Sequence, residues 1–315
     1  MARAVTKARI LPYDDYAIAE AARLIAQGKP VAMPTETVYG LAADATRGDA
    51  VAAIYAAKGR PSFNPLIVHV LDRAAAEKIA DLPEAARKLA DAFWPGPLTI
   101  VAPLKPEASI AALVTAGLPT VALRSPAHPA MRDLLRLCAR PLAAPSANAS
   151  GMISPTRAEH VLRSLGGSIE LIIDGGPTTV GLESTIVAVD ADSLRILRPG
   201  PVGAERLMQV SGLPVGAGAS GKIEAPGQLA QHYAPSKPVR LEATEKRDGE
   251  WLIGFGGIGG DASLSERGDL VEAAARLFEL LHQADAGETH RIAFAPIPDE
   301  GLGVAINDRL RRAAA

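Results

Sequence analysis

The sequence predicts an α/β protein built on a mixed, twisted sheet with a concave site, followed by a smaller α/β unit. Two observations predict it. Short apolar runs typical of strands alternate with segments of helical period along the chain. Polar residues stand at the ends of several expected strands, which is typical of a site along one edge of such a sheet. The length of 315 residues allows two domains.

Composition excludes several classes of protein. The net charge is −2 and charged residues make up 22% of the chain, without a strongly basic half, so any nucleic-acid contact is expected to be local. Cys138 is the single cysteine, which excludes an internal disulfide and leaves no zinc-binding pattern. No apolar run is long enough for a leader or a membrane span. We therefore expect a soluble, cytoplasmic protein that does not contact membranes.

Secondary structure in the first two thirds follows from periodicity and from helix start and stop signals. Asp14 and Asp15 precede the first helical pattern, and Gly28 ends it. Short β-branched or apolar runs give the strands. The expected helices are 17–29, 48–57, 73–80, 83–93, 128–139 and 157–165, and the expected strands are 30–33, 66–70, 98–102, 120–124, 141–144, 171–174, 186–190 and 194–197.

The stretch 34–70 carries the first chemical signal. A hydroxyl-rich turn, Thr35 to Thr37, follows the strand 30–33. Lys58 and Arg60 flank a glycine, and two residues spaced i, i+2 do not share a helix face. We expect a loop in which both cations turn towards one anion, such as a phosphate.

The last third predicts a linker and a second α/β unit. The segment 213–228 is rich in Gly, Ala and Pro, which is typical of a linker. Strands are expected at 239–241, 251–255 and 292–294, and helices at 269–283 and 304–312. The run 254–260 (GFGGIGG) follows a strand like a dinucleotide fingerprint, but no helix opens directly behind it, which favours a flexible loop.

Each polar residue at the end of an expected helix or strand, taken by itself, has an ordinary structural interpretation. Serine-rich turns before helices are usually caps, an arginine after a strand is usually a surface charge, and His69 in an apolar run is usually a core histidine. Together, several cations and hydroxyl-rich turns predict a site for a nucleotide or another phosphorylated ligand. The sequence holds no Walker pattern, nucleophile elbow or HExxH motif.

Seven motifs in a fixed order resemble the YrdC-domain family over residues 10–211. They are PTETVYGL, KGRPSFNPLIVHV, FWPGPLT, TVALRSP, APSANASGMISPT, GLESTIV and LRPG. The HYAP segment and the C-terminal unit resemble the longer members, the two-domain threonylcarbamoyl-AMP synthases. The resemblance implies a YrdC-like catalytic domain at 1–212, a linker or lid at 213–237 and a small Rossmann-like domain at 238–315.

The resemblance also implies a reaction. L-threonine, bicarbonate and ATP would give L-threonylcarbamoyladenylate, diphosphate and water, for the threonylcarbamoyladenosine of certain tRNAs. Mg²⁺ would accompany ATP, without a metal site of the protein's own. The implied partners are these substrates and the downstream tRNA threonylcarbamoyl-transferase machinery, with weak RNA binding as a further possibility.

Site residues implied by the resemblance fall into two groups. On the threonine side are Thr37, His69, Arg124, Ala144 (through its backbone) and Ser184. On the ATP side are Arg60, Asn64, Thr120, Ser146, Asn148, Ser154, Arg198 and Tyr233. Lys58 and Arg60 are expected to be the catalytic cations, with Lys58 facing phosphate.

The chain departs from the longer members just before HYAP. Their PGMxYRHYAP pattern has a Tyr and an Arg before HYAP, and this chain lacks both within the stretch Leu229 to Gln231. Tyr233 is kept, so we expect the linker to fold back over the nucleotide. Three other interpretations stay open: an RNA-binding module without catalysis, a carbamoyl-transferring relative of hydrogenase-maturation type, and a domain that senses ATP.

Overall fold

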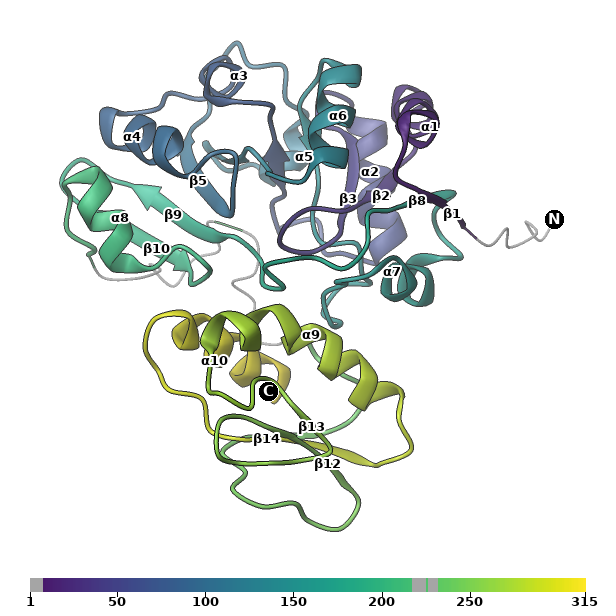
Figure 1. Ribbon diagram of the computed structural model, residues 1–315. Coiled ribbons are helices and arrows are strands. Elements are labelled where there is room, and N and C mark those ends of the chain that lie inside the picture. Colours follow the sequence, from purple (N-terminus) through teal and green to yellow (C-terminus); the bar gives the residue numbers. More distant parts are fainter. Residues whose placement is uncertain (1–7, 217–224, 226–231) are drawn as a thin grey trace.

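The computed structural model describes residues 8–216, 225 and 232–315, which form a larger and a smaller lobe (Figure 1). The predicted mixed sheet in the larger lobe is confirmed. Its strands are β1 (Arg9–Pro12), β2 (Val31–Met33), β3 (Gly40–Asp44), β4 (Ile67–His69), β5 (Leu98–Pro103), β6 (Thr120–Arg124), β7 (Leu142–Ala143), β8 (Leu171–Asp174), β9 (Thr185–Val189) and β10 (Leu194–Arg198). They lie in the order β1-β8-β2-β3-β7-β4-β6-β5-β9-β10, with parallel and antiparallel neighbours.

Helices cover both faces of this sheet, but not completely. They are α1 (Asp15–Ala26), α2 (Gly48–Lys58), α3 (Arg73–Glu77), α4 (Glu84–Phe93), α5 (Ala112–Thr115), α6 (Pro129–Cys138), α7 (Ala158–Leu165) and α8 (Ala204–Ser211). Side chains of α1 and α6 pack with Val31 and Met33, whereas those of α2, α4 and α7 pack with Ala32. Since successive strand residues point to opposite faces, these two cores lie on opposite sides of β2.

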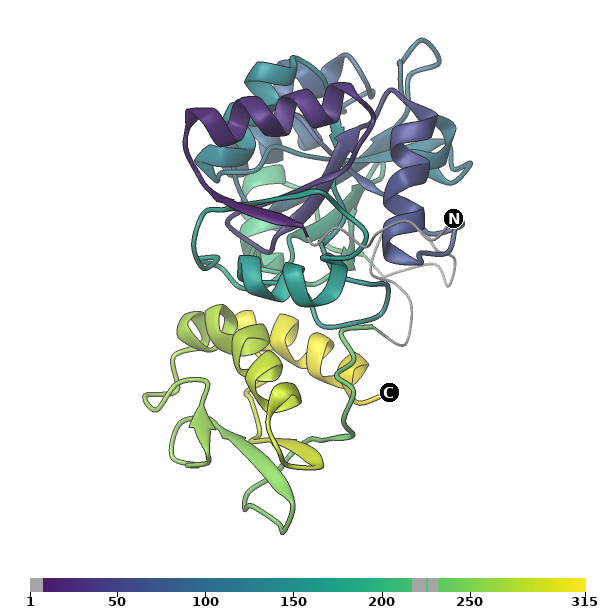
Figure 2. The same cartoon turned by 90° about the vertical axis from the view of Figure 1, so that its right-hand side faces the viewer.

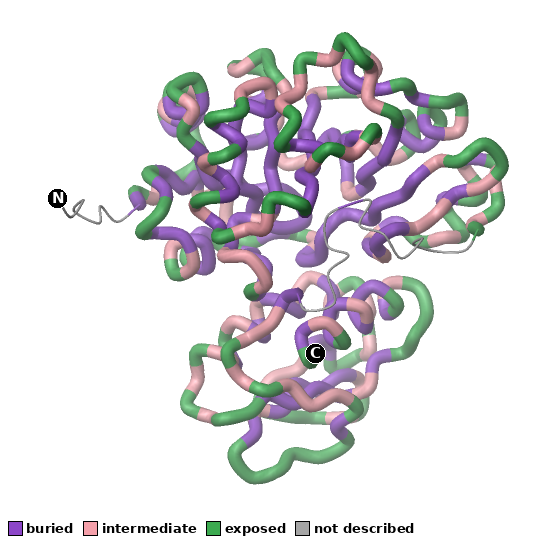
Figure 3. The backbone as a smooth tube through the Cα atoms, turned by 180° about the vertical axis from the view of Figure 1, so that it is seen from behind, coloured by how far each residue is buried: buried purple, intermediate pink, exposed green. Residues whose placement is uncertain are grey.

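One half of a face carries no helix among the described residues. There, Ile67 of β4 and Ala122 of β6 pack with β5, β9 and β10 and with Ala225 of the expected linker. His69 and Arg124 each follow Ile67 and Ala122 by two residues, so they point to this same face. The strands themselves are mostly buried (Figure 3). The helix-free half therefore leaves room for a site on a rigid base.

The smaller lobe is a parallel α/β unit, as predicted. Its strands β11 (Val239–Arg240), β12 (Glu250–Gly254), β13 (Ala262–Ser263) and β14 (Arg291–Phe294) lie in the order β11-β14-β12-β13, and all pairs are parallel. Helices α9 (Leu270–Ala286) and α10 (Leu302–Ala313) lie between this sheet and the larger lobe (Figures 1 and 2). The glycine-rich run makes a tight turn in which Phe255 and Ile258 exchange backbone hydrogen bonds, so it is a loop and not a helix start.

The sequence-based assignment missed several elements, among them β1, β3 and α8. β3 reads Gly-Leu-Ala-Ala-Asp, all buried, and its alanines carry neither alternation nor β-propensity. Its pairing with β2 and β7 makes it a strand, which only the tertiary structure decides.

The described helices include none that is both long and apolar enough to cross a membrane. Residues 229–231, where the chain departs from its relatives, lie outside the described residues.

The two lobes share one apolar cluster. Val38, Ile153 and Leu182 of the larger lobe pack with residues of α9 and α10. Gly181 has a left-handed φ of +75°, and a Cβ added there would lie 2.4 Å from the carbonyl oxygen of Ala274 in α9. Glycine at this position therefore permits the close approach of α9.

We predict that Gly181→Ala destabilises the protein more than its matched control Gly176→Ala. Both glycines have φ near +80°, but a Cβ at Gly176 meets no atom within 4 Å. The control should cost about 1 kcal/mol of backbone strain, and Gly181→Ala a further 1–3 kcal/mol or so from overpacking. Urea unfolding measures both, with fluorescence of Trp94 and Trp251 reporting one lobe each. Equal unfolding midpoints would contradict the tight packing of α9 on Gly181.

Candidate active site

The hydroxyl-rich turn after β2 offers one hydroxyl oxygen as an acceptor. The Thr35 hydroxyl donates to the carbonyl oxygen of Val38 at 2.7 Å and lies 2.9 Å from the Thr37 hydroxyl. Because the Thr35 proton is already used, Thr37 must be the donor in the hydroxyl pair. Both side chains are buried, and Thr37 keeps its oxygen lone pairs for a ligand that donates.

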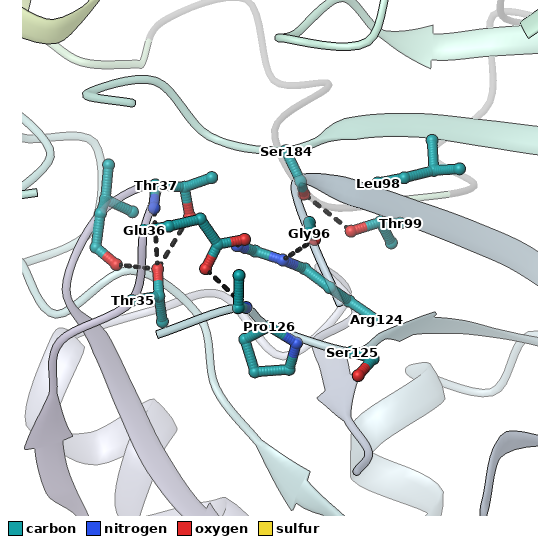
Figure 4. Close-up of polar contacts among 12 residues, drawn as sticks. Thr35, Glu36, Thr37, Gly96, Leu98, Thr99, Arg124, Ser125, Pro126 and Ser184 are labelled. Atoms are coloured by element: carbon teal, nitrogen blue, oxygen red, sulfur yellow. Dashed lines mark hydrogen bonds and ion pairs between the residues drawn. The ribbon is translucent and has the colours of Figure 1, made fainter. Parts of the chain in front are cut away.

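Glu36, within the same turn, holds Arg124 at the end of β6. The Glu36 carboxylate accepts from Arg124 Nη2 at 2.6 Å and from the Ala127 amide at 3.0 Å, while Arg124 Nε donates to the Gly96 carbonyl. Figure 4 shows Glu36 between the threonine turn and Arg124. Burial by itself raises the pKa of Glu36, but the charge and hydrogen bond of Arg124 outweigh it, so the pKa lies below its usual value. Glu36 was not among the predicted site residues.

His69 lies beside Arg124, because parallel β4 and β6 pair these two residues. Burial, and then the charge of Arg124, hold the pKa of His69 well below its usual range. The imidazole is therefore neutral at physiological pH. Its Nδ1 has no hydrogen-bond partner among the described residues.

Ser184, before β9, is held by β5 and β10. Its hydroxyl lies 2.7 Å from that of Thr99, as Figure 4 shows, and Arg198 donates to its hydroxyl and carbonyl oxygens at 3.1 and 3.0 Å. A Cβ at Gly200 would lie 2.4 Å from the Thr185 amide nitrogen, so only glycine lets the loop after β10 lie against Ser184.

The loop after α2 places its two cations differently, which corrects the expectation that both turn to one anion. Arg60 faces the cavity and donates to the carbonyl oxygens of Asn64 and Pro65. Lys58 is buried instead and donates to the carbonyl oxygens of Ser146 and Asn148. Burial, followed by the charge of Arg60, lowers the pKa of Lys58 well below its usual value. Lys58 thus holds the 146–148 turn in place.

Asn64 and Thr120 lie at the other end of the parallel pair. Thr120 begins β6 and Arg124 ends it, so about 13 Å separate their α-carbons at the rise of a strand. Asn64 lies shortly before the start of β4, at the same end of the parallel pair as Thr120. The predicted threonine-side and ATP-side residues on these two strands are therefore one strand length apart.

Several buried polar atoms near the cavity lack partners among the described residues. They are both side-chain amide atoms of Asn64, Asn148 Oδ1, His69 Nδ1, His232 Nδ1 and the Tyr233 hydroxyl. Buried polar groups in folded proteins are nearly always hydrogen-bonded. A cluster of such atoms is typical of a site whose ligand supplies the missing bonds.

Ser154 and Tyr233 do not line the cavity themselves but lie where the smaller lobe meets its wall. The Ser154 hydroxyl donates to Glu183, whose other carboxylate oxygen accepts from Arg309 of α10 at 2.9 Å. The Tyr233 ring lies 5.2 Å from the Arg309 guanidinium carbon. Glu183 and Arg309 were also missed, because nothing in the sequence pairs residues from different lobes.

Half of the predicted site residues line one cavity, with about 550 Å³ of space outside protein atoms, part of it open to solvent. Lys58, Asn64, Thr120, Asn148, Ser154, Ser184 and Tyr233 are not among its lining residues. Among the described residues, three arginines and one carboxylate line it, so this part of its wall is net positive and suits an anion. The lining residues are Thr35, Thr37, Val38, Gly40, Arg60, Ile67, His69, Arg124, Ala144, Pro145, Ser146, Glu183, Arg198 and His232. Within the described residues, no group of three or more His, Cys, Asp or Glu side chains is placed to hold a metal ion.

Comparisons with known proteins match the chain in two consecutive segments. The family of Sua5, YciO and YrdC proteins, described as "Telomere recombination", matches residues 23–200. The family described as "Threonylcarbamoyl-AMP synthase, C-terminal domain" matches residues 202–315. Two relatives, the threonylcarbamoyl-AMP synthases of Bacillus subtilis and Pyrococcus abyssi, are each 42% identical over 96% of this chain and cover 94% and 95% of their own lengths.

Solved structures agree with the sequence matches. The crystal structure of P. abyssi Sua5 complexed with L-threonine has a TM-score of 0.88 and 38% identity, and the match covers 97% of each chain. Escherichia coli YciO, at 17% identity and a TM-score of 0.56, shares the fold over 64% of this chain and 99% of its own. With both segments matched in order, the chain belongs to the threonylcarbamoyl-AMP synthase family.

Proposed function

We propose that this protein makes L-threonylcarbamoyladenylate from L-threonine, bicarbonate and ATP, with release of diphosphate and water. The observation that carries the proposal is the positive cavity on the helix-free half of the sheet, in which three arginines stand among neutral polar groups and one carboxylate, Glu183. The similarity of the chain to relatives named threonylcarbamoyl-AMP synthase supports the proposal. Both reacting species are anions, so charge compensation is the main requirement of the reaction.

Arg124 is our proposed carboxylate-binding residue for L-threonine. A guanidinium has five N–H donors, and Glu36 and Gly96 take two of them. The remaining donors suit a carboxylate. Thr37 would accept from the amine or hydroxyl group. His69, Ser184 and the backbone of Ala144 complete the proposed threonine side.

The ATP side in this proposal is centred on Arg60 and Arg198. Both line the cavity together with Ser146, and arginines bind phosphate oxygens through paired N–H donors. The side-chain amide of Asn64 and the Oδ1 atom of Asn148, which lack partners among the described residues, would bond to the nucleotide. Thr120, Ser154 and Tyr233 complete the proposed set.

The chemistry then needs positioning more than acid–base groups. The threonine amine and bicarbonate give a carbamate and water. A carbamate oxygen forms a bond to the α-phosphorus of ATP, and the bond from that phosphorus to the bridging oxygen breaks, so diphosphate leaves with the electron pair. Arg60 would compensate charge on the leaving phosphates, which keeps it as the proposed catalytic cation. Lys58 takes a different role from the one expected, because it orders the turn that carries Ser146.

Mg²⁺ would arrive bound to the triphosphate, since Mg²⁺ commonly binds through substrate phosphates and keeps several waters. The adenylate is labile in water, so a downstream tRNA threonylcarbamoyl transferase must consume it. We therefore expect the protein to act in the cytoplasm, with tRNA reached through that partner or by weak direct contact.

We propose residues 213–237 as a lid over the cavity, between a catalytic domain at 1–212 and a small domain at 238–315. Ala225 packs on the helix-free half of the sheet, and His232 lines the cavity. Tyr233 is fully buried with φ of +65°, a strained conformation for tyrosine that the surrounding packing must maintain. Closure of such a segment protects a reactive adenylate from water.

We predict that diphosphate release from MgATP requires both L-threonine and bicarbonate. A coupled phosphate assay with pyrophosphatase measures it, with each component omitted in turn and with L-serine in place of threonine. Omission of either should abolish release, and serine should support it poorly because it lacks the methyl group. Release that is independent of threonine would overturn the proposed function.

Reciprocal substitutions should separate the two ends of the cavity. Arg124→Lys keeps a charge for Glu36 but loses the planar fork, so the KM for threonine should rise about tenfold or more while that for ATP changes little. Arg60→Ala should instead raise the KM for ATP and lower kcat, with the fold retained by circular dichroism. Arg136→Lys, an exposed site on α6, is the matched control. If Arg124→Lys raises the KM for ATP instead, the assignment of the two ends is wrong.

A further inference from the structure

One buried charge of the smaller lobe reaches the wall of the cavity. Arg309 of α10 has a 1% exposed side chain and donates through Nε to the cavity-lining Glu183 at 2.9 Å. Its Nη1 donates to Asp308, and its Nη2 has no partner among the described residues. A fully buried ion pair contributes little net stability, because desolvation offsets the attraction. Stabilisation of the contact between the two lobes therefore does not explain why Arg309 is placed there.

Ser154 is held by both helices of the smaller lobe. Its hydroxyl donates to Glu183, which Arg309 holds from α10. Its carbonyl oxygen lies 3.1 Å from Nε2 of His282 in α9, and since a carbonyl only accepts, His282 must donate there. The 154 turn thus has its hydroxyl and its carbonyl fixed from the other lobe.

Arg309 also supports the segment that closes the cavity. Its guanidinium lies over the ring of Tyr233 at 5.2 Å, within the range of a cation–π contact. Phe278 of α9 packs on the same ring at 5.6 Å between centroids, and the His232 amide donates to the backbone of Arg312. One side chain therefore touches the cavity wall and the segment 232–233 together.

We propose that Arg309 is a positioning residue for nucleotide binding, supplied to the cavity by the smaller lobe. By holding Glu183, it sets the hydroxyl of Ser154, and by holding the Tyr233 ring, it sets the closing segment. Docking of α10 and binding of ATP are then coupled. This inference rests on the proposed function, in which Ser154 and Tyr233 belong to the ATP side.

The role has a consequence for pH. Burial raises the pKa of Glu183, but the charges of Arg309 and Arg198 and the hydrogen bond from Ser154 bring it below its usual value, so Glu183 is charged at neutral pH. Without Arg309 the effect of burial gains weight and the pKa rises. ATP binding should then be lost as the pH falls through that raised pKa. The charged or titratable groups that face Glu183 or its partner are Arg198, Arg309, Asp308, His232 and Tyr233.

The test uses the full chain and four variants: Arg309→Met, Arg309→Lys, the double variant Glu183→Gln/Arg309→Met, and the control Arg311→Met. Arg311 lies on the same helix, with a 60% exposed side chain. ATP binding is measured by calorimetry and diphosphate release by steady-state kinetics, from pH 5.5 to 8.5 or so. We expect Arg309→Met to weaken ATP binding about tenfold or more, with the KM for threonine within about twofold. The ATP affinity of Arg309→Lys should lie between those of Arg309→Met and the unsubstituted protein, and that of the control should match the unsubstituted protein.

The pH profile separates positioning from mere support of the fold. Arg309→Met should lose ATP affinity towards low pH, and the double variant should not, because it lacks the titrating carboxyl group. Lower kcat with unchanged ATP affinity in both Arg309 variants would overturn the inference, as would a profile identical to that of the control. If Arg309→Met does not fold, the Arg309→Lys titration decides in the same way. Diphosphate release by the unsubstituted protein without threonine would instead overturn the proposed function. Calorimetry of ATP binding would still test the role of Arg309 in that case.

Discussion

The grouping of three arginines in one cavity wall, with Arg124 and Arg198 buried and Arg60 half-buried, is the constraint on which the surrounding structure depends. A guanidinium removed from water needs acceptors and opposite charge close by. Glu36 supplies both to Arg124, the carbonyl oxygens of Asn64 and Pro65 serve Arg60, and Ser184 serves Arg198. These contacts use part of each donor set and leave the rest for a ligand. The cavity is thus arranged for anions before any anion binds, which is how electrostatic preorganisation lowers a barrier.

The parallel pair of β4 and β6 gives the cavity its direction. His69 and Arg124 stand together where these strands end, while Asn64 and Thr120 stand where they begin. The adenylate of an amino-acid carbamate is an elongated molecule with a carboxylate at one end and a base at the other. A rigid sheet whose neighbouring strands carry different polar groups at opposite ends suits such a molecule, and the helix-free half of the face gives it access.

Much of this arrangement could be predicted from the sequence, and the failures have a common physical cause. Strand ends put His69 and Arg124 at one edge, and the hydroxyl-rich turn marked Thr37. Glu36 and Glu183 could not be found in this way, because their arginine partners lie 88 and 126 residues away and depend on tertiary packing. Lys58 was assigned to phosphate from its spacing to Arg60. Its side chain instead runs from the end of α2 to the carbonyl oxygens of the 146–148 turn, a tertiary contact that local sequence does not encode.

The most direct test of the account is a crystal structure of the protein with L-threonine and a non-hydrolysable MgATP analogue. We expect the threonine carboxylate on Arg124 beside His69, and the triphosphate on Arg60 and Arg198, with the α-phosphorus between them and the base beyond Asn64. The closing segment should cover the nucleotide with Tyr233 still under Arg309. A triphosphate bound at Arg124, or a nucleotide bound outside the helix-free half of the sheet, would contradict it.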